Sequence, residues 1–332
     1  MGSPVEHARS GDGADAEGAS VRQEDVAVFE ASRDRLEAIA YRLLGSAVEA
    51  EDAVQETFLR WERADRNQVR VPEAWLTRVL TNLCLTQLTS ARARREVYVG
   101  EWLPEPVLDG DPMLGPADTA EQRDSVSTAV LMLLERLTPP ERAVYVLREA
   151  FAYPHAEIAE LLGISEAASQ QLLHRAKQRV ATGRSRVQVD SATAREVVEE
   201  FLLAAMSGQT EPLVRLLTDD AMGVGDGGGR VPARGTPFVG AVTVARFLRG
   251  LFRPADSKRA FFDGRLDLYA STANGSPAVV AVAGGRLIGV MSLEVTDTGI
   301  ASVLSQVNPD KLGRFARAWA ESDHGDPVLV GW

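Results

Sequence analysis

The stretch GISEAASQQLLHRAKQRVATGRSR, residues 163–186, decides how its part of the chain folds. The preceding segment from His155 repeats apolar side chains along one helical face, Gly163 can form a tight turn, and Ser165 can cap a second helix. The second helix is basic at its far end, because one acid, Glu166, stands against five Arg and Lys residues in a chain of net charge −11. The pattern predicts two helices joined by a short turn.

Helix-turn-helix units of this kind place their second helix in the major groove of DNA. Glutamine can pair with adenine edges, and arginine pairs with guanine or holds phosphate. The stretch therefore favours a DNA-binding helix, although a surface helix with a solvated charged face remains open from this pattern alone. The expected contacts on this helix are Gln170, Gln171, His174, Arg175, Lys177 and Arg179.

Length and composition limit the kind of protein. A chain of 332 residues predicts two or three domains. Residues 1–24 are small and polar, with mixed charges and no apolar core of a signal peptide, so they are expected to form a disordered tail. No apolar run is long enough to span a membrane, and the single cysteine, Cys84, excludes internal disulfides. A cytoplasmic protein without a membrane partner is expected.

The first 187 residues have helical periodicity on both sides of a break. Residues 25–96 predict a first helical domain, in which Gly45 ends one helix, Ser46 caps the next and Pro72 opens a third. Residues 97–119 contain four prolines and five acids and read as an acidic linker, which could reach about 75 Å if fully extended. The helical domains on either side, the second at 120–187, would then not need to touch.

The pattern changes after residue 190. Helical segments come first, followed by four strand-like runs at 259–270, 278–285, 286–295 and 300–307. This order predicts an α+β domain over 190–322, in which a curved sheet wraps a helix, followed by a tail at 323–332. The predicted fold class is thus an all-α half with a helix-turn-helix, followed by an α+β half.

Three motifs of the helical half occur in a recognisable order. They are AEDAVQETFLRW at 50–61, PEAWLTRVLTNLCLTQL at 72–88 and LTPPERAVYVLREAFAYPHAEIAELLGIS at 137–165. Together they resemble regions 2.2, 2.3–2.4 and 4 of extracytoplasmic function (ECF) sigma factors. The resemblance implies that 163–186 holds the helix that reads the minus-thirty-five promoter element.

The same resemblance implies a polymerase-binding face on the second helix. Asp52, Gln55, Glu56 and Leu59 follow helical spacing opposite the apolar stripe. In the family this face meets the clamp helices of the polymerase β′ subunit, and an acidic and amide face suits a basic helical partner. Taken without the neighbouring motifs, the set is more typical of a solvated helix face.

Opening the minus-ten element requires a protein that captures unstacked bases. Unstacking a base costs a few kcal/mol, which contacts in a binding pocket offset. In the family, the loop before the third helix and an asparagine within that helix do this, and basic residues follow. The resemblance maps this role onto Arg66, Asn67, Asn82, Arg92, Arg94 and Arg95. A core helix with a polar exterior is the alternative.

Three short motifs, WLPEP at 102–106, DGGGR at 226–230 and NPDK at 308–311, resemble the sigma-J type of ECF sigma factor, which carries a SnoaL-like (NTF2-like) domain after region 4. The resemblance implies that this domain regulates the sigma domains in place of a separate anti-sigma factor. A plain turn and a helix cap explain the last two motifs equally well. The expected regulatory residues are Trp102, Pro104, Asp226, Arg230, Asn308, Asp310 and Lys311.

The sequence therefore predicts a non-enzymatic sigma factor that binds core RNA polymerase, including its β subunit, and promoter DNA. No cofactor or metal is expected, while the C-terminal domain could bind a small molecule. Residues 190–320 contain no histidine and no spaced pair of acids typical of acid–base chemistry. Two alternatives remain: a stand-alone ligand-responsive DNA-binding regulator, and a SnoaL-like isomerase or cyclase with a DNA-binding leader.

Overall fold

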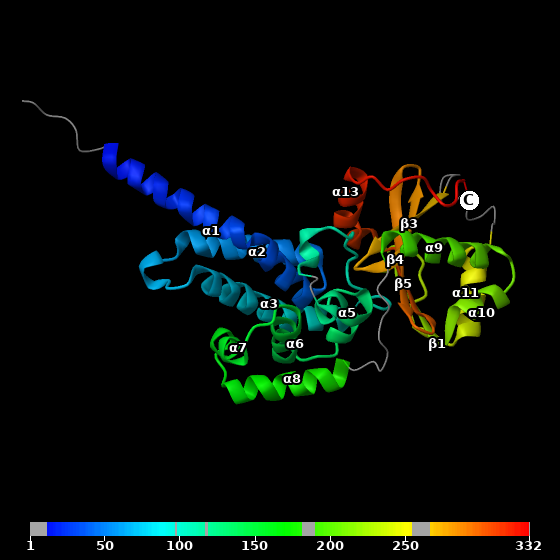
Figure 1. Cartoon of the computed structure of the whole chain (residues 1–332), viewed down its shortest axis with the longest axis horizontal. Coiled ribbons are helices and arrows are strands. Elements are labelled where there is room, and N and C mark those ends of the chain that lie inside the picture. The colour runs from blue at the N-terminus through cyan, green and yellow to red at the C-terminus, as the bar shows by residue number, and fades with distance from the viewer. Residues whose placement is uncertain (1–11, 97, 117–118, 181–189, 254–265, 332) are drawn as a thin grey trace, which may run out of the picture.

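The computed structural model describes residues 12–96, 98–116, 119–180, 190–253 and 266–331, and for part of these, including 12–22 and 91–96, it describes the backbone alone. An all-helical half and a half built on a sheet lie next to each other along the long axis of the molecule (Figure 1). The fold class predicted from the sequence is confirmed.

The helical half has two groups of helices. Gly45 ends the first helix, and the Ser46 side chain accepts a hydrogen bond from the Glu49 amide at 3.1 Å, as the sequence predicted. The first group is α1 (Asp12–Leu44), α2 (Ala47–Arg63), the 3-10 turn η1 (Arg66–Gln68) and α3 (Pro72–Glu96). The second is η2 (Pro112–Leu114), α4 (Ala120–Asp124), α5 (Thr128–Leu134), α6 (Pro139–Tyr145), the π-helical turn η3 (Val146–Ala150), α7 (His155–Leu162) and α8 (Glu166–Val180).

Helix α1 begins inside the segment 1–24, which the sequence predicted to be disordered throughout. That expectation is wrong for the backbone from Asp12 onward. Because these residues are mostly polar, they do have little apolar surface to bury. A helix nucleated by the packed stretch around Phe29 and Leu36, however, can extend through alanine, glutamate and glutamine without a new nucleation cost. Residues 1–11 lie outside the described residues.

The two groups of helices share one apolar core. Leu36, Leu80 and Cys84 from the first group belong to the same buried cluster as Leu147 and Ile158 from the second. Two buried arginines add hydrogen bonds between the two groups. Arg42 Nε donates to Ser125 Oγ at 2.8 Å, and Arg142 Nε donates to the Arg42 carbonyl oxygen at 3.4 Å. The linker length allowed the two groups to lie apart, but in this structure they touch.

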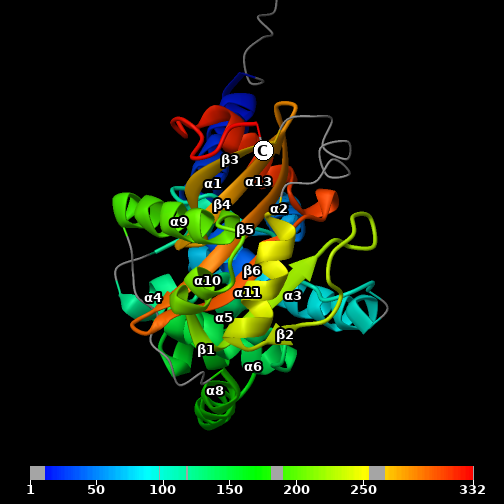
Figure 2. The ribbon, with the colours of Figure 1, turned by 90° about the vertical axis from the view of Figure 1, so that its right-hand side faces the viewer.

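The C-terminal half contains a six-stranded sheet in the order β2-β1-β6-β5-β4-β3, antiparallel except for the parallel pair β1 and β6. Helices α9, α10 and α11 cover its inner face (Figure 2). The bounds are α9 (Ser191–Met206), α10 (Glu211–Leu216), β1 (Leu217–Asp226), β2 (Phe238–Val239), α11 (Ala241–Leu251), β3 (Leu266–Ala273), β4 (Ser276–Ala283), β5 (Arg286–Thr296), β6 (Gly299–Gln306), η4 (Pro309–Lys311) and α13 (Gly313–Glu321).

Strands β3 to β6 match the four predicted runs, except that the start of the first run lies outside the described residues. Strand β1 was missed. Its sequence LTDDAMGVGD contains three aspartates and two glycines, residue types that are depleted in strands. Gly223 is needed because the Phe238 ring lies over it, where an added Cβ would come within 2.2 Å of the ring. Packing against a neighbouring strand therefore overrides local preference here.

The described part of the chain holds no helix with the length and apolar character that crossing a membrane requires.

Candidate functional site

Helix α2 presents the predicted polymerase-binding set on the face away from the core. Asp52 and Gln55 are exposed, while Glu56 and Leu59 are half-buried. The opposite face buries Val54 and Trp61, among others. Glu56 pairs with Arg60 on the surface at 2.8 Å, a contact that contributes little to stability. The structure thus brings these four residues together on one accessible surface.

The residues predicted to capture promoter bases lie around η1 and along α3. Asn67 and Asn82 are exposed. Arg66 is already engaged, because its Nε pairs with Asp25 at 2.9 Å and its guanidinium lies over the Trp61 ring at 3.7 Å. The predicted contacts Arg92, Arg94 and Arg95 fall where the structure describes the backbone alone, so their side chains lie outside the described residues.

Helix α8 carries the predicted DNA-reading residues on its exposed side. Gln170, Gln171 and His174 are exposed. The opposite side buries Ser169 and Ala176, and Ser169 contacts His155 Nδ1 of α7 at 2.8 Å, which holds the two helices of the helix-turn-helix together.

The three basic residues of α8 are tied to acids of their own domain. Arg175 and Arg179 both pair with the buried carboxylate of Glu141 at the start of α6, and Lys177 pairs with Glu149 at 2.8 Å. Burial opposes the charge of Glu141, but the Thr138 amide and the two arginines outweigh it and lower its pKa. These ion pairs therefore hold α8 against its domain, while Gln170 and Gln171 lie exposed and His174 Nε2 lies 3.0 Å from Gln178 Nε2.

The seven predicted regulatory residues meet where the C-terminal domain touches the segment after α3. Lys311 Nζ donates to Asp226 Oδ2 and to the Leu103 carbonyl oxygen, both at 2.7 Å, and lies over the rings of Tyr98 and Trp102. Arg230 pairs with Asp310 at 3.3 Å on the surface above. We call Tyr98, Trp102, Leu103, Asp226, Asn308 and Lys311 the central clasp.

Asp226 is the centre of the clasp. It is fully buried and accepts hydrogen bonds from Tyr98 Oη at 2.7 Å, the Leu103 amide at 2.9 Å and Gln306 Nε2 at 3.2 Å, besides Lys311. Burial, and then the bond to Asp226, raises the Tyr98 pKa, so Tyr98 stays protonated and donates. Removing Asp226 from this pair would leave the Lys311 charge buried without its carboxylate, which costs about 3–5 kcal/mol.

The backbone of the NPDK and DGGGR segments allows Asn308 and Gly228 to approach each other closely beside the clasp. Asn308 Oδ1 accepts from the Asp310 amide at 3.1 Å, and Asn308 Nδ2 donates to Tyr98 Oη at 2.8 Å. Gly228 adopts a φ of 58°, and an added Cβ there would lie 2.2 Å from Asn308. DGGGR is a turn, as predicted, and it also allows this close approach. Pro104 is buried beside the clasp, where its carbonyl oxygen lies 3.4 Å from Gln306 Nε2.

Two contacts further along the linker were missed by sequence reasoning. Asn274, at the β3–β4 turn, donates from Nδ2 to Tyr41 Oη of α1 at 2.7 Å and accepts from the Val107 amide at 3.0 Å. The Glu105 carboxylate accepts from Ser46 Oγ at 2.6 Å and from the Ala47 amide at 3.0 Å, so it caps the start of α2. The dipeptide Asn274-Gly275 signals a hairpin turn, but nothing in the sequence points to its partner on α1.

A second interdomain cluster, the Arg314 cluster, consists of Arg314, Asp111, Glu51 and Glu37. Arg314 donates to both oxygens of Asp111, at 2.8 and 2.7 Å, and it also pairs with Glu51 on α2 and with Glu37 on α1 at 3.7 Å. Burial disfavours the Arg314 charge, but Asp111 and Glu51 outweigh it and raise its pKa. The cluster therefore fixes α13 against the first helical group, next to the predicted polymerase-binding set.

Comparisons with known proteins agree with this architecture. Family models for sigma-70 region 2 and sigma-70 region 4 match residues 28–94 and 127–180. The chain is 36% identical over 294 residues to the ECF RNA polymerase sigma factor SigJ of Mycobacterium tuberculosis, covering 86% of this chain and 93% of that protein. It is 33% identical over 292 residues to the probable ECF RNA polymerase sigma factor SigI of the same species, covering 86% of this chain and 94% of that protein.

A solved structure extends the likeness to the whole arrangement. The crystal structure of Mycobacterium tuberculosis SigJ matches with a TM-score of 0.66 at 33% sequence identity, covering 87% of this chain and 98% of that one. The match includes the helical half and the curved sheet together. The chain, with its two sigma-70 regions and its clasped C-terminal domain, belongs to the family of ECF RNA polymerase sigma factors.

Proposed function

We propose that this sigma factor is held closed by its own C-terminal domain, and that opening of the central clasp allows it to direct transcription initiation. Sigma factors bind core RNA polymerase and promoter DNA and are not enzymes, so the family favours this function over the two alternatives weighed from the sequence. The observation that carries the proposal is the burial of the linker segment 103–107 between the domains, with Lys311 bonded to Leu103 and Asp226.

The closed arrangement is incompatible with reading both promoter elements at once. Elements centred about 25 base pairs apart lie roughly 85 Å apart on B-DNA, at about 3.4 Å per base pair. In the closed state α3 touches the loop that leads into α7, because Thr77 Oγ1 lies 3.3 Å from Tyr153 Oη, and the two helical groups share one core. Region 2 and region 4 must therefore separate before both can contact the same promoter.

Separation requires the linker to leave the C-terminal domain. A linker of 23 residues approaches this separation, at about 75 Å, only when it is extended, and the central clasp, Glu105 and Asn274 hold it in a folded path. These contacts are mainly hydrogen bonds and charge pairs, which water can replace when the interface opens. The C-terminal domain would thus act in place of a separate anti-sigma factor, in a protein that works in the cytoplasm.

In the open state each predicted surface would have its own role. Asp52, Gln55, Glu56 and Leu59 would dock on the clamp helices of β′, while the second helical group would meet the β subunit and the upstream DNA. Asn67 and Asn82 would hold unstacked bases of the minus-ten element, with Arg66 beside them. Gln170, Gln171 and His174 would read base edges in the major groove.

Run-off transcription with purified core RNA polymerase tests the proposal. We expect Asp226→Ala, which removes the acceptor at the centre of the clasp, to raise promoter-dependent transcription above the wild type. Asp219→Ala, on the same strand but exposed, is the matched control and should behave like the wild type. A folded Asp226→Ala protein that transcribes at or below the wild-type level would overturn the proposal.

A further inference from the structure

A cavity of about 580 Å³ lies where all parts of the molecule meet, on the outer side of the sheet and not among the helices that cover its inner face. Leu88 comes from α3, Trp102 from the linker, Met132 from α5, Met222 from β1 and Ser302 from β6. Its volume is within the range of about 300–1,000 Å³ that is typical of small-molecule sites, which occur preferentially between domains.

The floor of the cavity is apolar and easily deformed. Ala129, Met132 and Met222 are partly buried there, packed against a small core of Leu103, Val224 and Leu304. Methionine sulfur is polarisable and makes favourable contacts with aromatic rings about 5 Å away. The indole of Trp102 adds an aromatic wall. This floor therefore suits a flat ring system.

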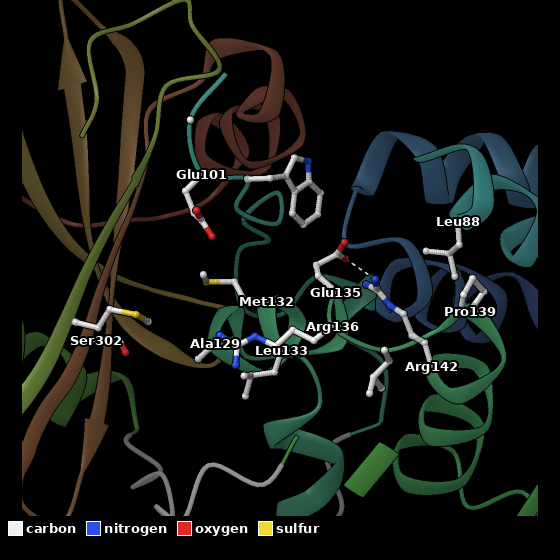
Figure 3. Close-up of a pocket in the computed structure, with 14 residues that line it drawn as sticks. Leu88, Glu101, Ala129, Met132, Leu133, Glu135, Arg136, Pro139, Arg142 and Ser302 are labelled. Atoms are coloured by element: carbon white, nitrogen blue, oxygen red, sulfur yellow. Dashed lines mark hydrogen bonds and ion pairs between the residues drawn. The ribbon is translucent and has the colours of Figure 1, made fainter. Parts of the chain in front are cut away.

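Two opposite charges flank the floor. Glu101 points in from the linker, and the Arg136 side chain extends along the other side of Met132 (Figure 3). Within the described part of the chain, no acid pairs with the Arg136 guanidinium, no base pairs with Glu101, and the two do not pair with each other. The neighbouring Arg142 is already held by Glu135 (Figure 3). Arg136 and Glu101 are thus available to a ligand placed between them.

We propose that this cavity binds an aromatic hydroxy acid. Its ring would lie on Met132 and Met222, its carboxylate would accept hydrogen bonds from Arg136, and a hydroxyl at its far end would donate to Glu101. Guanidinium–carboxylate bonds are among the stronger polar contacts in proteins, and the carboxylate of Glu101 accepts but cannot donate.

Such a ligand would favour the closed state, because its binding surface exists only while the linker, α5 and the sheet are together. This coupling rests on the proposed function, whereas the binding itself does not. At a ligand concentration ten times the dissociation constant, the ratio of closed to open molecules should rise about elevenfold.

The test uses 6-hydroxy-2-naphthoate, a fluorescent probe of this class, titrated against the full-length protein. We expect saturable binding that Arg136→Met weakens about 10- to 100-fold, in line with the loss of one charged hydrogen-bonding partner. Arg246→Met, an exposed residue of α11 outside the cavity, is the control and should bind like the wild type. The 6-methoxy analogue should bind the wild type more weakly than the hydroxy probe, and Glu101→Gln, which can donate to the methoxy oxygen, should reduce that difference.

Absence of saturable binding, or equal binding by the wild type and Arg136→Met, would overturn the site. An equal loss in Arg246→Met would also overturn it, since the binding would then be unspecific. The separation between α2 and α7 can be followed by energy transfer between labels on Glu62→Cys and Glu160→Cys. If the probe binds as expected but leaves this distance unchanged, the site stands and its coupling to closure is refuted. Failure of the closed-state proposal is thereby distinguished from failure of the site.

Discussion

The two faces of the C-terminal sheet are built differently. The inner face packs apolar side chains such as Leu293 and Val303 against Phe201 of α9 and Leu248 of α11. On the outer face, the part under α13 is also apolar, with Val280 and Val290 packed on Phe315 and Trp319, whereas the part under the linker buries Asp226 and Gln306. Both faces exclude water, but the inner one does so by hydrophobic contact and much of the outer one by hydrogen bonds and charge pairs.

This difference indicates which contacts hold the domain together and which hold it onto the sigma regions. Burial of apolar surface contributes roughly 25 cal/mol per Å² to the free energy of folding, and this contribution is lost when the surface is exposed to water. A satisfied polar interface contributes much less net free energy, because water can satisfy the same groups after separation. Substitutions on the outer face should therefore open the molecule, while substitutions on the inner face should unfold the domain.

The largest effect is expected for Asp226→Ala. Lys311, the Leu103 amide and Tyr98 would each lose their acceptor in a buried site, which should destabilise the closed state by about 3–5 kcal/mol. Labels on Glu62→Cys and Glu160→Cys, exposed on α2 and α7, should report a longer distance by energy transfer, while circular dichroism stays unchanged. An unchanged distance would contradict the role of the clasp.

Leu293→Ala probes the inner face. Removing a fully buried leucine should lower the free energy of unfolding by about 2–5 kcal/mol. We expect thermal unfolding of the C-terminal domain to move to a lower temperature, with the energy-transfer distance unchanged below that transition. If Leu293→Ala opened the molecule before unfolding it, the distinction between the two faces would be lost.

The sequence predicted the elements of the fold well where local patterns decide them. Gly45, Ser46 and Pro72 set the helix boundaries of the first group, and alternating apolar residues located β4 to β6. Strand β1 was missed because Asp219, Asp220 and its two glycines hide the alternation, and its place in the sheet comes from pairing with β6.

The sequence predicted only some of the residues that join the C-terminal domain to the rest of the chain, and there is a physical reason for this. The motifs WLPEP, DGGGR and NPDK were singled out, and the structure brings their residues together, although their regulatory role stays a prediction. Arg314 and Asn274 were missed, because their partners lie more than 140 positions away and no local pattern encodes such contacts. The packing of the linker was also missed, because its prolines and acids show only an irregular acidic segment, while the amide donors that Glu105 finds lie at the start of α2.

Lys311→Met should have a smaller effect than Asp226→Ala. Asp226 would keep its bonds from Tyr98, Leu103, Gln306 and the Gly228 amide, so one charged donor is lost and the carboxylate stays solvated by the protein. We expect a loss of about 1–3 kcal/mol in closure, measured with the same labelled pair. Equal effects of the two substitutions would show that the ion pair, and not the carboxylate's set of donors, dominates the clasp.

Arg314→Gln tests whether the second cluster is electrostatic. Its partners Asp111, Glu51 and Glu37 form an acidic group that Arg314 neutralises in part, with Arg317 also 3.7 Å from Glu51, and salt shortens the reach of such interactions from about 8 Å at 0.15 M to about 3 Å at 1 M. The wild type should therefore open partly when salt is raised, and Arg314→Gln should be more open at low salt and respond less. An identical salt response in both proteins would assign closure to other contacts.

The smallest effect is expected for Glu105→Gln, because glutamine can still accept from the amides of Ala47 and Val48 and can donate to Ser46. Burial raises the pKa of Glu105 in the closed state, whereas an exposed glutamate in the open state titrates near its ordinary value. The closed state therefore holds this proton more tightly, so the contribution of Glu105 to closure is largest at low pH and is lost as pH rises through the raised pKa. The wild type should close further as pH falls through the raised pKa of Glu105, and Glu105→Gln should lack that part of the response while differing by about 1 kcal/mol or less at pH 7. Identical pH profiles for the two proteins would show that the linker carboxylate takes no part in setting the balance between the two states.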